Sequence, residues 1–466
     1  MESSKQVNFR SIATLALAVL YLINEIIKVE WLGLVTGFLL VGVLSLSLLA
    51  VEGASRAIGI GLFVVGGIIF TWLGAEPALW FQGLNRNLYL LAMFILVPLL
   101  GAPIRQGGYM ETLRSFFRQY IRVDSLFYLL VKSFTLFIAV MINVAVIPLM
   151  HQIGLASDKS SNSRLMAVSL SRGFAASIIW APSYAAVALV LELSGARWID
   201  LFPYGLGLGV GAILLGSLMT RIEGQQGKTE PEINQQEAIQ QSLGEQSEGV
   251  NWEKIAELGF FGLVLIGGIV VASQLTGIAT VTVVSMAAII FPVVWLAAIG
   301  CLPRWWTEVR GSYFHIALPK VKNEVVLFAG AGFLATAIDI SAFSQLAPIV
   351  LERLVGDSPL FLSLVIISLV VLLSALGVHP IITVTVIGSI LQAEYYHVTP
   401  TFIALILTTG WALGAAVSPS SATNISVASL VDRSVLEVSR WNLGYTFILF
   451  VLTWVVLNLA HWLGHI

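Results

Sequence analysis

Apolar runs long enough to cross a bilayer recur along the whole chain. We expect continuous spans at 11–28, 31–50, 57–74, 87–117, 198–220, 253–272, 278–299, 322–355 and 441–463. Two more runs, 163–195 and 400–432, have a proline and hydroxyl residues at their centres, which predicts broken helices. The runs at 125–157 and 359–396 are interrupted by Asn143 and His379-Pro380, and we interpret them as re-entrant hairpins. The pattern predicts an all-α polytopic membrane protein with about 11 spans and two hairpins.

The break in the second of these helices is the most polar part of any apolar run. It carries Ser418, Pro419, Ser420, Ser421, Thr423 and Asn424. Proline removes a backbone donor, and freed backbone groups in a membrane must meet protein, water or a bound solute. The alternative is a proline kink whose hydroxyls bond back to the helix.

A second copy of this stretch favours a break that binds a solute over a simple proline kink. Gly173, Ala175, Pro182 and Ser183 match Gly410, Ala412, Pro419 and Ser420, all at an offset of 237 residues. Proline-broken apolar segments in matching positions of two halves point to a transport site near the bilayer midplane. We therefore predict two repeats, 31–220 and 253–466, after a first span at 1–30 and joined by a polar cytoplasmic linker at 221–252.

The basic residues predict the orientation of the repeats. With a cytoplasmic N-terminus and two hairpins that leave by the side they entered, seventeen basic residues lie inside and four outside. The inside set is Lys5, Arg10, Arg56, Arg114, Arg118, Arg122, Lys159, Arg164, Arg221, Lys228, Lys254, Arg304, Arg310, Lys320, Lys322, Arg433 and Arg440, and the outside set is Lys28, Arg86, Arg197 and Arg353. This bias follows the positive-inside rule and makes the two repeats inverted.

Composition supports the membrane class and narrows the functions. The chain is 58% hydrophobic and 11% charged, with a mean hydropathy of +0.91, which excludes an ordinary soluble domain. A net charge of −2 without a basic aromatic patch gives no support for nucleic-acid binding. Cys301 is the single cysteine, so no disulfide forms within the chain. No metalloprotease, P-loop or hydrolase motif occurs, so we expect no enzyme activity and no cofactor beyond a coupling ion.

The order of these elements resembles the ion transporter superfamily, and within it the divalent anion:sodium symporters. The resemblance is carried by Val417-Ser-Pro-Ser-Ser-Ala-Thr-Asn-Ile425 and Trp180-Ala-Pro-Ser-Tyr184, and it covers nearly the whole chain. It implies inverted repeats, a homodimer, and hairpin tips that read Ser-Asn-Thr. Here the tips read Ile142-Asn-Val144 and Val378-His-Pro380.

Four residues are candidates for coupling or for attracting the solute. His379 stands where the family has a sodium-binding amide, which suggests proton linkage, or else it is a neutral buried histidine. Asp339, expected mid-span, could bind a cation, carry a proton or pair with a neighbour. Asn143, at the first tip, is a candidate for both solute and ion. Arg172 could attract an anion or extend to the headgroups. We treat Lys132 and Glu192 as interfacial.

These features favour a secondary active transporter in a bacterial inner membrane. Helix N-termini at the breaks suit an anionic solute, a carboxylate or an oxyanion, and unwound carbonyls suit Na⁺. Coupling to Na⁺ or H⁺ through alternating access is expected. An inorganic-ion antiporter (Na⁺/H⁺ exchange or arsenite efflux) and a non-transporting membrane subunit are the alternatives.

Overall fold

The computed structural model describes residues 2–226 and 249–466, and the regular structure in these ranges is helical. The first half contains α1 (Glu2–Ile27), α2 (Glu30–Ala50), α3 (Gly53–Trp72), α4 (Pro77–Asn85), α5 (Leu88–Leu96), η1 (Val97–Gly101), α6 (Ala102–Gln106), α7 (Tyr109–Tyr120), α8 (Asp124–Ile142), η2 (Asn143–Ala145), α9 (Val146–Gly154), η3 (Asp158–Ser161), α10 (Ser163–Ile178), α11 (Ala185–Ser194) and α12 (Trp198–Gln226). The second contains α14 (Trp252–Thr276), α15 (Thr280–Ala298), α16 (Arg304–Glu308), η4 (Val309–Ala317), α17 (Leu318–Lys320), α18 (Lys322–Asp339), α19 (Phe343–Val355), α20 (Pro359–Ala375), α21 (Pro380–Ile390), η5 (Ala393–Tyr396), α22 (Pro400–Val417), α23 (Ala422–Val431) and α24 (Val435–Trp462).

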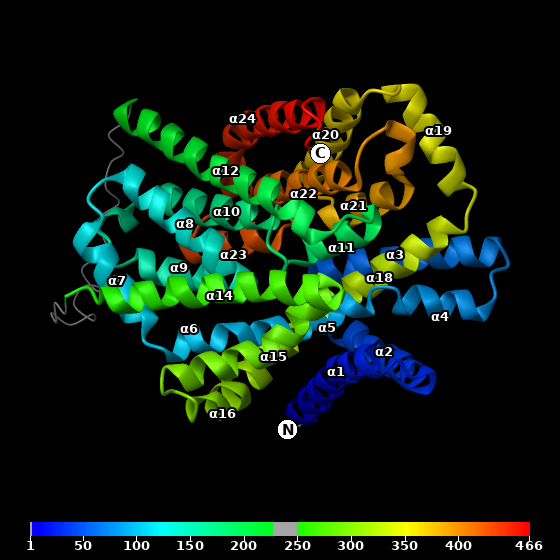
Figure 1. Ribbon diagram of the computed structural model, residues 1–466, viewed down its shortest axis with the longest axis horizontal. Coiled ribbons are helices and arrows are strands. Elements are labelled where there is room, and N and C mark those ends of the chain that lie inside the picture. Colours follow the sequence, from blue (N-terminus) through cyan, green and yellow to red (C-terminus); the bar gives the residue numbers. More distant parts are fainter. Residues whose placement is uncertain (1, 227–248) are drawn as a thin grey trace.

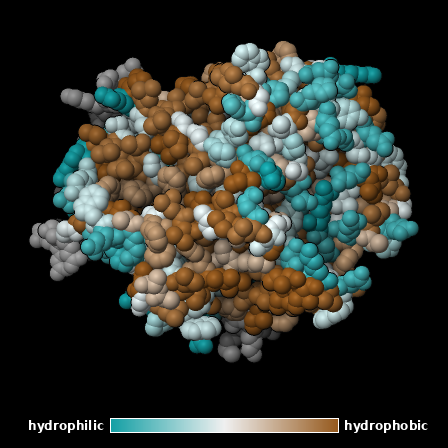
Figure 2. All heavy atoms as spheres, in the orientation of Figure 1, coloured by the Kyte–Doolittle hydropathy of each residue, from teal (hydrophilic) through white to brown (hydrophobic). Residues whose placement is uncertain are grey.

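The helices have the length and surface of a membrane protein. Ten segments in the described ranges are long and apolar enough to cross a bilayer, or eleven if the bent pair Arg304–Lys320 and Lys322–Asp339 is one span. Large apolar side chains such as Leu49, Trp72 and Leu275 are more than 80% exposed, and Figure 2 shows wide apolar areas on one face. Such a surface suits lipid, and the predicted all-α polytopic class is confirmed.

Three predicted boundaries fall differently in the structure, and one is the expected span at 322–355, which is divided into α18 and α19 with a break at 340–342. The expected span at 87–117 is interrupted: Pro98 lies in the 3₁₀ segment η1, and Gly108, with φ of +78°, begins the separate amphipathic helix α7. The predicted linker at 221–252 begins inside α12 and ends at the start of α14. Its residues 227–248 lie outside the described ranges.

The run at 125–157 folds back on itself as a hairpin. Asp124, at the start of α8, forms an ion pair with Lys159, just beyond α9, at 3.3 Å. Gly154, at the end of α9, packs against Phe127 near the start of α8. In the second hairpin α21 packs along α20, and the Tyr396 hydroxyl donates to the Pro348 carbonyl in α19 at 3.5 Å.

The two glycines matched in sequence occupy matching places in space. A Cβ atom on Gly173 of α10 would lie 3.0 Å from the Lys132 carbonyl oxygen in α8. A Cβ atom on Gly410 of α22 would lie 3.1 Å from the Val370 Cβ atom in α20. Each broken helix therefore packs closely on the first arm of its own hairpin, because glycine lets the two helices approach.

The last helices of the two halves, α12 and α24, run in opposite directions. Near the start of α12 the Tyr204 hydroxyl donates to the His465 carbonyl, just beyond the end of α24. Further along α12, the Ala212 carbonyl accepts a bond from Tyr445, which lies nearer the start of α24. The halves also interlock: α9 packs on α23, and α21 packs on α11 (Figure 1). This is the arrangement of an inverted repeat with its two broken helices crossing at the centre.

Candidate functional site

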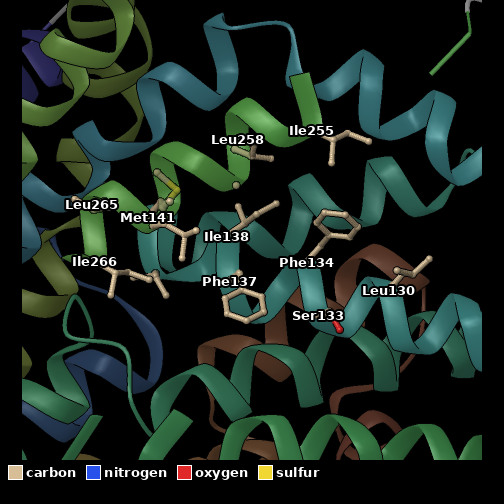
Figure 3. Close-up of a pocket in the computed structure, with 14 residues that line it drawn as sticks. Leu130, Ser133, Phe134, Phe137, Ile138, Met141, Ile255, Leu258, Leu265 and Ile266 are labelled. Atoms are coloured by element: carbon tan, nitrogen blue, oxygen red, sulfur yellow. The ribbon is translucent and has the colours of Figure 1, made fainter. Parts of the chain in front are cut away.

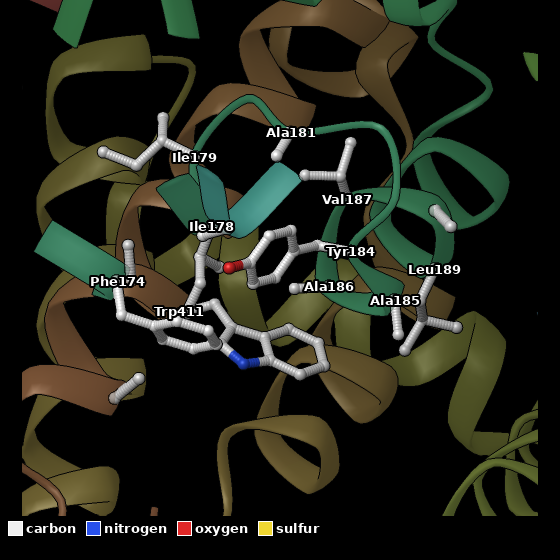
Figure 4. Packing of buried hydrophobic residues seen from close by; sticks show 14 of the residues in the cluster. Phe174, Ile178, Ile179, Ala181, Tyr184, Ala185, Ala186, Val187, Leu189 and Trp411 are labelled. Carbon is white, nitrogen blue, oxygen red and sulfur yellow. The ribbon is translucent and has the colours of Figure 1, made fainter. Parts of the chain in front are cut away.

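The first break, between α10 and α11, is closed by aromatic side chains. All of residues 179–184 are buried, Pro182 included. The Trp198 indole donates to the Trp180 carbonyl at 2.8 Å, and the Tyr184 hydroxyl is bonded to the Ser177 hydroxyl at 2.9 Å. Figure 4 shows Tyr184 packed near Phe174 and Trp411. The freed backbone at this break is thus enclosed in protein.

Ser183 connects the first break to the first hairpin. Its hydroxyl donates to the carbonyl of Val140, three residues before the hairpin tip at Asn143. Asn143 has a φ of +51° and is half-buried, and its side-chain oxygen accepts from the Val144 amide at 2.7 Å. Ser183 therefore lies close to the tip of the first hairpin, and Asn143 holds the sharp turn of that tip.

The second break, between α22 and α23, is polar and more open. The hydroxyls of Ser418 and Ser420 are bonded at 2.9 Å, while Pro419 and Ser420 are only half-buried. Ser421 precedes α23, and its hydroxyl accepts a hydrogen bond from the backbone N–H of Asn424 at 3.2 Å. Thr423 is buried in the first turn. The N-terminus of α23 carries the partial positive charge of the helix dipole and lies beside these hydroxyls.

Asn424 is the central side chain of the second break. It is completely buried, and its amide nitrogen donates to the carbonyls of Ala416 at 2.9 Å and Ser418 at 3.0 Å. The amide thereby caps the C-terminal end of α22. Its side-chain oxygen has no hydrogen-bond partner in the described part of the chain. A buried acceptor without a partner at the break of a helix suits a bound donor or a cation.

The tip of the second hairpin lies against the second break. Gly377 is next to Pro419, since a Cβ atom on Gly377 would lie 4.0 Å from the proline ring. His379 is half-buried and caps α21: its Nδ1 accepts from the Ile381 amide at 3.2 Å. Each hairpin tip therefore packs on the break of its own repeat.

Asp339 does not lie in the middle of a span, and the prediction that it does is wrong. It is the last residue of α18, its side chain is 40% exposed, and it forms an ion pair with Arg86. The helix ends there, and Ser344 donates to the Asp339 carbonyl after the chain turns. Of the three roles considered for Asp339 (cation binding, proton transfer and pairing with a neighbour), the structure shows the pairing.

Arg172 and Lys132 lie deep in the bundle. Arg172 is 4% exposed and donates to the Asn442 side chain at 2.9 Å and to the Trp441 carbonyl at 3.0 Å, so it does not extend to the headgroups. Lys132 is completely buried, so our interfacial assignment of it is wrong. The missed signal is its place in α8, eight residues after Asp124 and ten before Ile142.

Two cavities separate the broken-helix bundle from the other helices. A polar cavity of about 640 Å³ lies between α11 and helices α1, α5, α14 and α15, and it is lined by Tyr21, Glu25 and Glu192 among others. An apolar cleft of about 390 Å³ lies between α8 and α14, with Phe134, Phe137 and Leu258 on its walls (Figure 3). Glu192 thus faces a cavity. In the described ranges, no three or more His, Cys, Asp or Glu side chains are grouped so that they could hold a metal ion.

Comparison with known proteins identifies the fold. The structure of the YdaH transporter of Alcanivorax borkumensis superposes with a TM-score of 0.55 and 14% identity, covering 80% of this chain and 85% of that one. MtrF of Neisseria gonorrhoeae, described as one of a class of antimetabolite efflux pumps, gives 0.45 at 14% identity over 78% and 79%. No family model matches the chain, and no curated protein matches it. The chain thus has the fold of a solved transporter, and membership of the divalent anion:sodium symporters stays a hypothesis.

Proposed function

We propose that the protein is a secondary active transporter that moves a small anionic solute, of the carboxylate or oxyanion class, by alternating access. The observation that carries this proposal is the second break, where the unpartnered oxygen of Asn424 lies within a crossing of two inverted broken helices. Such crossings suit a solute because they expose helix ends and unwound backbone to it. The fold shared with a solved transporter agrees with this function.

In this proposal the second break binds the solute and the first supports it. The N-terminus of α23, with the hydroxyls of Ser418 and Ser420, binds the anionic group of the solute. Ser421 and Thr423 line the same turn, and Asn143, Pro182 and Ser183 form the opposite wall. The Asn424 oxygen accepts a donor from the solute or helps to hold a coupling Na⁺, since amide oxygens are hard ligands.

The proposed movement is a displacement of the bundle of hairpins and broken helices past the remaining helices. The cleft between α8 and α14 is lined mainly by apolar side chains, so α8 can move along α14 without breaking buried hydrogen bonds. The polar cavity brings water to the C-terminal half of α11, beside Glu192. A homodimer, implied by the family resemblance, would keep the remaining helices fixed, and a bacterial inner membrane is the expected location.

The alternatives receive less support from the geometry. Na⁺/H⁺ exchange through Asp339 needs a carboxylate free to exchange cations, whereas Asp339 is paired with Arg86 at a helix end. A non-transporting subunit has no use for two interlocked breaks with an unpartnered buried acceptor.

Counterflow in proteoliposomes tests the proposal. Vesicles with purified protein are loaded with one unlabelled solute and challenged with a trace of the same labelled solute, across a panel of mono- and dicarboxylates, sulfate and arsenite. We expect accumulation of at least one carboxylate or oxyanion, absent from protein-free vesicles. Repeating the assay with imposed Na⁺ and pH gradients identifies the coupling ion. Accumulation of arsenite alone would favour inorganic efflux, and no accumulation of any of these solutes would contradict the proposal.

A further inference from the structure

Two cations share one aromatic ring inside the bundle. Lys132 of α8 and Arg172 of α10 both lie over the ring of Tyr445 in α24, with Nζ 4.5 Å and the guanidinium carbon 4.3 Å from its centre. Lys132 is completely buried and Arg172 is 4% exposed. Two like charges on one ring repel each other strongly where water is excluded.

No carboxylate of the described residues lies within ion-pair distance of either cation. Lys132 donates to three neutral acceptors, the Ala212 carbonyl at 2.6 Å, the Tyr445 hydroxyl at 2.6 Å and the Tyr128 hydroxyl at 3.3 Å. Buried charges in proteins are normally paired, and ionisable residues inside a membrane protein usually have a function. A guanidinium stays charged in proteins, so the positive charge of Arg172 has no anionic partner among the side chains of the described ranges.

Arg172 has donors to spare, and a small cavity adjoins it. Its Nε and Nη2 are bonded to Asn442 and Trp441, whereas Nη1 has no partner among the described residues. The cavity, of about 10 Å³, lies where α10 and α22 cross. Its lining consists of Arg172, Tyr445 and apolar side chains, namely Ala175, Ala176, Ile179, Ala412, Leu413, Ala416 and Leu449. A volume of this order admits about one water-sized guest.

We propose that this cavity is a binding site for a single halide ion, chloride under ordinary conditions, held by the Arg172 guanidinium. The size of the cavity favours a monatomic anion over a carboxylate or an oxyanion, and the apolar walls supply no negative charge to oppose it. The bound ion neutralises the charge that Arg172 brings to the crossing of the broken helices.

The halide site has a direct connection to the second break. Asn442, which accepts from Arg172, donates at 3.2 Å to the Ala416 carbonyl, the same oxygen that accepts from Asn424. A halide that fixes Arg172 thereby also fixes the two amides that cap the end of α22. The halide site and the proposed solute site are separate: one adjoins Ala416 at the crossing, the other the hydroxyls of Ser418 and Ser420.

Thermal unfolding of the purified protein measures the binding. We expect choline chloride and choline bromide, compared with choline gluconate at equal ionic strength, to raise Tm by roughly 2–4 °C in a saturating manner. Arg172→Gln should abolish the rise. Arg197→Gln, which removes an exposed arginine paired with Asp200, is the matched control and should retain it. Choline acetate should act like gluconate, and a rise with acetate instead of chloride would overturn the halide assignment.

Bromide-soaked crystals of the native chain give a test that does not depend on a variant folding. An anomalous peak beside Arg172 and Tyr445 is the expected result. Density without anomalous signal, together with a Tm insensitive to halide, would mean that water fills the cavity and would overturn the proposal. Neither measurement involves the transported solute, so a failed halide test leaves the transport proposal to be judged by counterflow alone.

Discussion

At the first break, Trp198 and Ser177 each form a hydrogen bond to a residue of the unwound stretch, and every residue from 179 to 184 is buried. At the second, Pro419 and Ser420 are half-buried, and the unpartnered atom in the described ranges is an acceptor, the Asn424 oxygen, whereas at the first break it is a donor, Trp180 Nε1. The stretches are matched at an offset of 237 residues, yet Val187 stands where the second has Asn424. The duplication explains why the two breaks share one backbone arrangement. The difference in side chains makes the second break the more polar of the two. The predictions below test that asymmetry.

The largest expected effect is on transport and comes from the second break. Asn424→Ala removes both the unpartnered oxygen and the cap on α22, so a solute or ion bound there loses its partner. We expect uptake of the solute found by counterflow to fall by roughly 10- to 100-fold, corresponding to a loss of 1–3 kcal/mol. Asn458→Ala, which removes an amide bonded to Ser363 in the same repeat, is the control and should transport normally. Unchanged uptake by the Asn424 variant would contradict the assignment.

The matched glycines should differ in their tolerance of a methyl group. Gly173→Ala places Cβ 3.0 Å from a backbone oxygen of α8, which can move only with its helix, so we expect a loss of about 1–3 kcal/mol in stability. Gly410→Ala meets the Val370 Cβ at 3.1 Å and both its γ carbons at 3.4 Å, whereas the three atoms nearest to a Cβ on Gly173 lie at 2.9–3.1 Å, so the expected loss is smaller. Urea-induced loss of helix signal or thermal unfolding in detergent compares the two. Equal losses of stability in the two variants would mean that both helix contacts accommodate a methyl group equally well.

Much of this frame could be predicted from the sequence. The register of Gly173 with Gly410 and the return of each hairpin follow from local pattern, because duplication preserves spacing. The burial of Lys132 could not be predicted in this way, since its partner Tyr445 lies 313 residues away. Asp339 was misplaced for a similar reason: the end of α18 coincides with an ion pair to Arg86, 253 residues earlier. Single-sequence patterns report helices and breaks, whereas contacts between distant helices decide which charged group is buried.

The register-matched serines should separate stability from binding. Ser183→Ala removes a buried hydroxyl and leaves the Val140 carbonyl without this donor, so we expect a loss of about 1–2 kcal/mol in stability with nearly unchanged solute affinity. Ser420→Ala lies at the half-buried break, so the apparent affinity should fall several-fold while stability changes little. Thermal unfolding and the concentration dependence of uptake measure the two effects. If Ser183→Ala lowered the solute affinity and Ser420→Ala lowered only the stability, the first break would be the one that binds the solute.

The smallest expected effect concerns His379, whose Nδ1 caps α21 by accepting the Ile381 amide. His379→Ala loses this bond, and we expect a cost of about 1 kcal/mol in stability, whereas Asn is an equally good cap and His379→Asn should cost almost nothing. The bond requires an unprotonated Nδ1, so acidification that protonates the ring should remove the cap from the native chain and leave the Asn variant unaffected. Thermal unfolding followed as a function of pH measures this difference. The same two proteins also test proton coupling: if His379 carries the coupling proton, the pH dependence of uptake flattens in His379→Asn. If the Asn variant unfolds and transports with the same pH dependence as the native chain, the imidazole is neither a titrating cap nor the proton carrier. The functional difference between the two breaks would then come from the side chains of residues 418–424 alone.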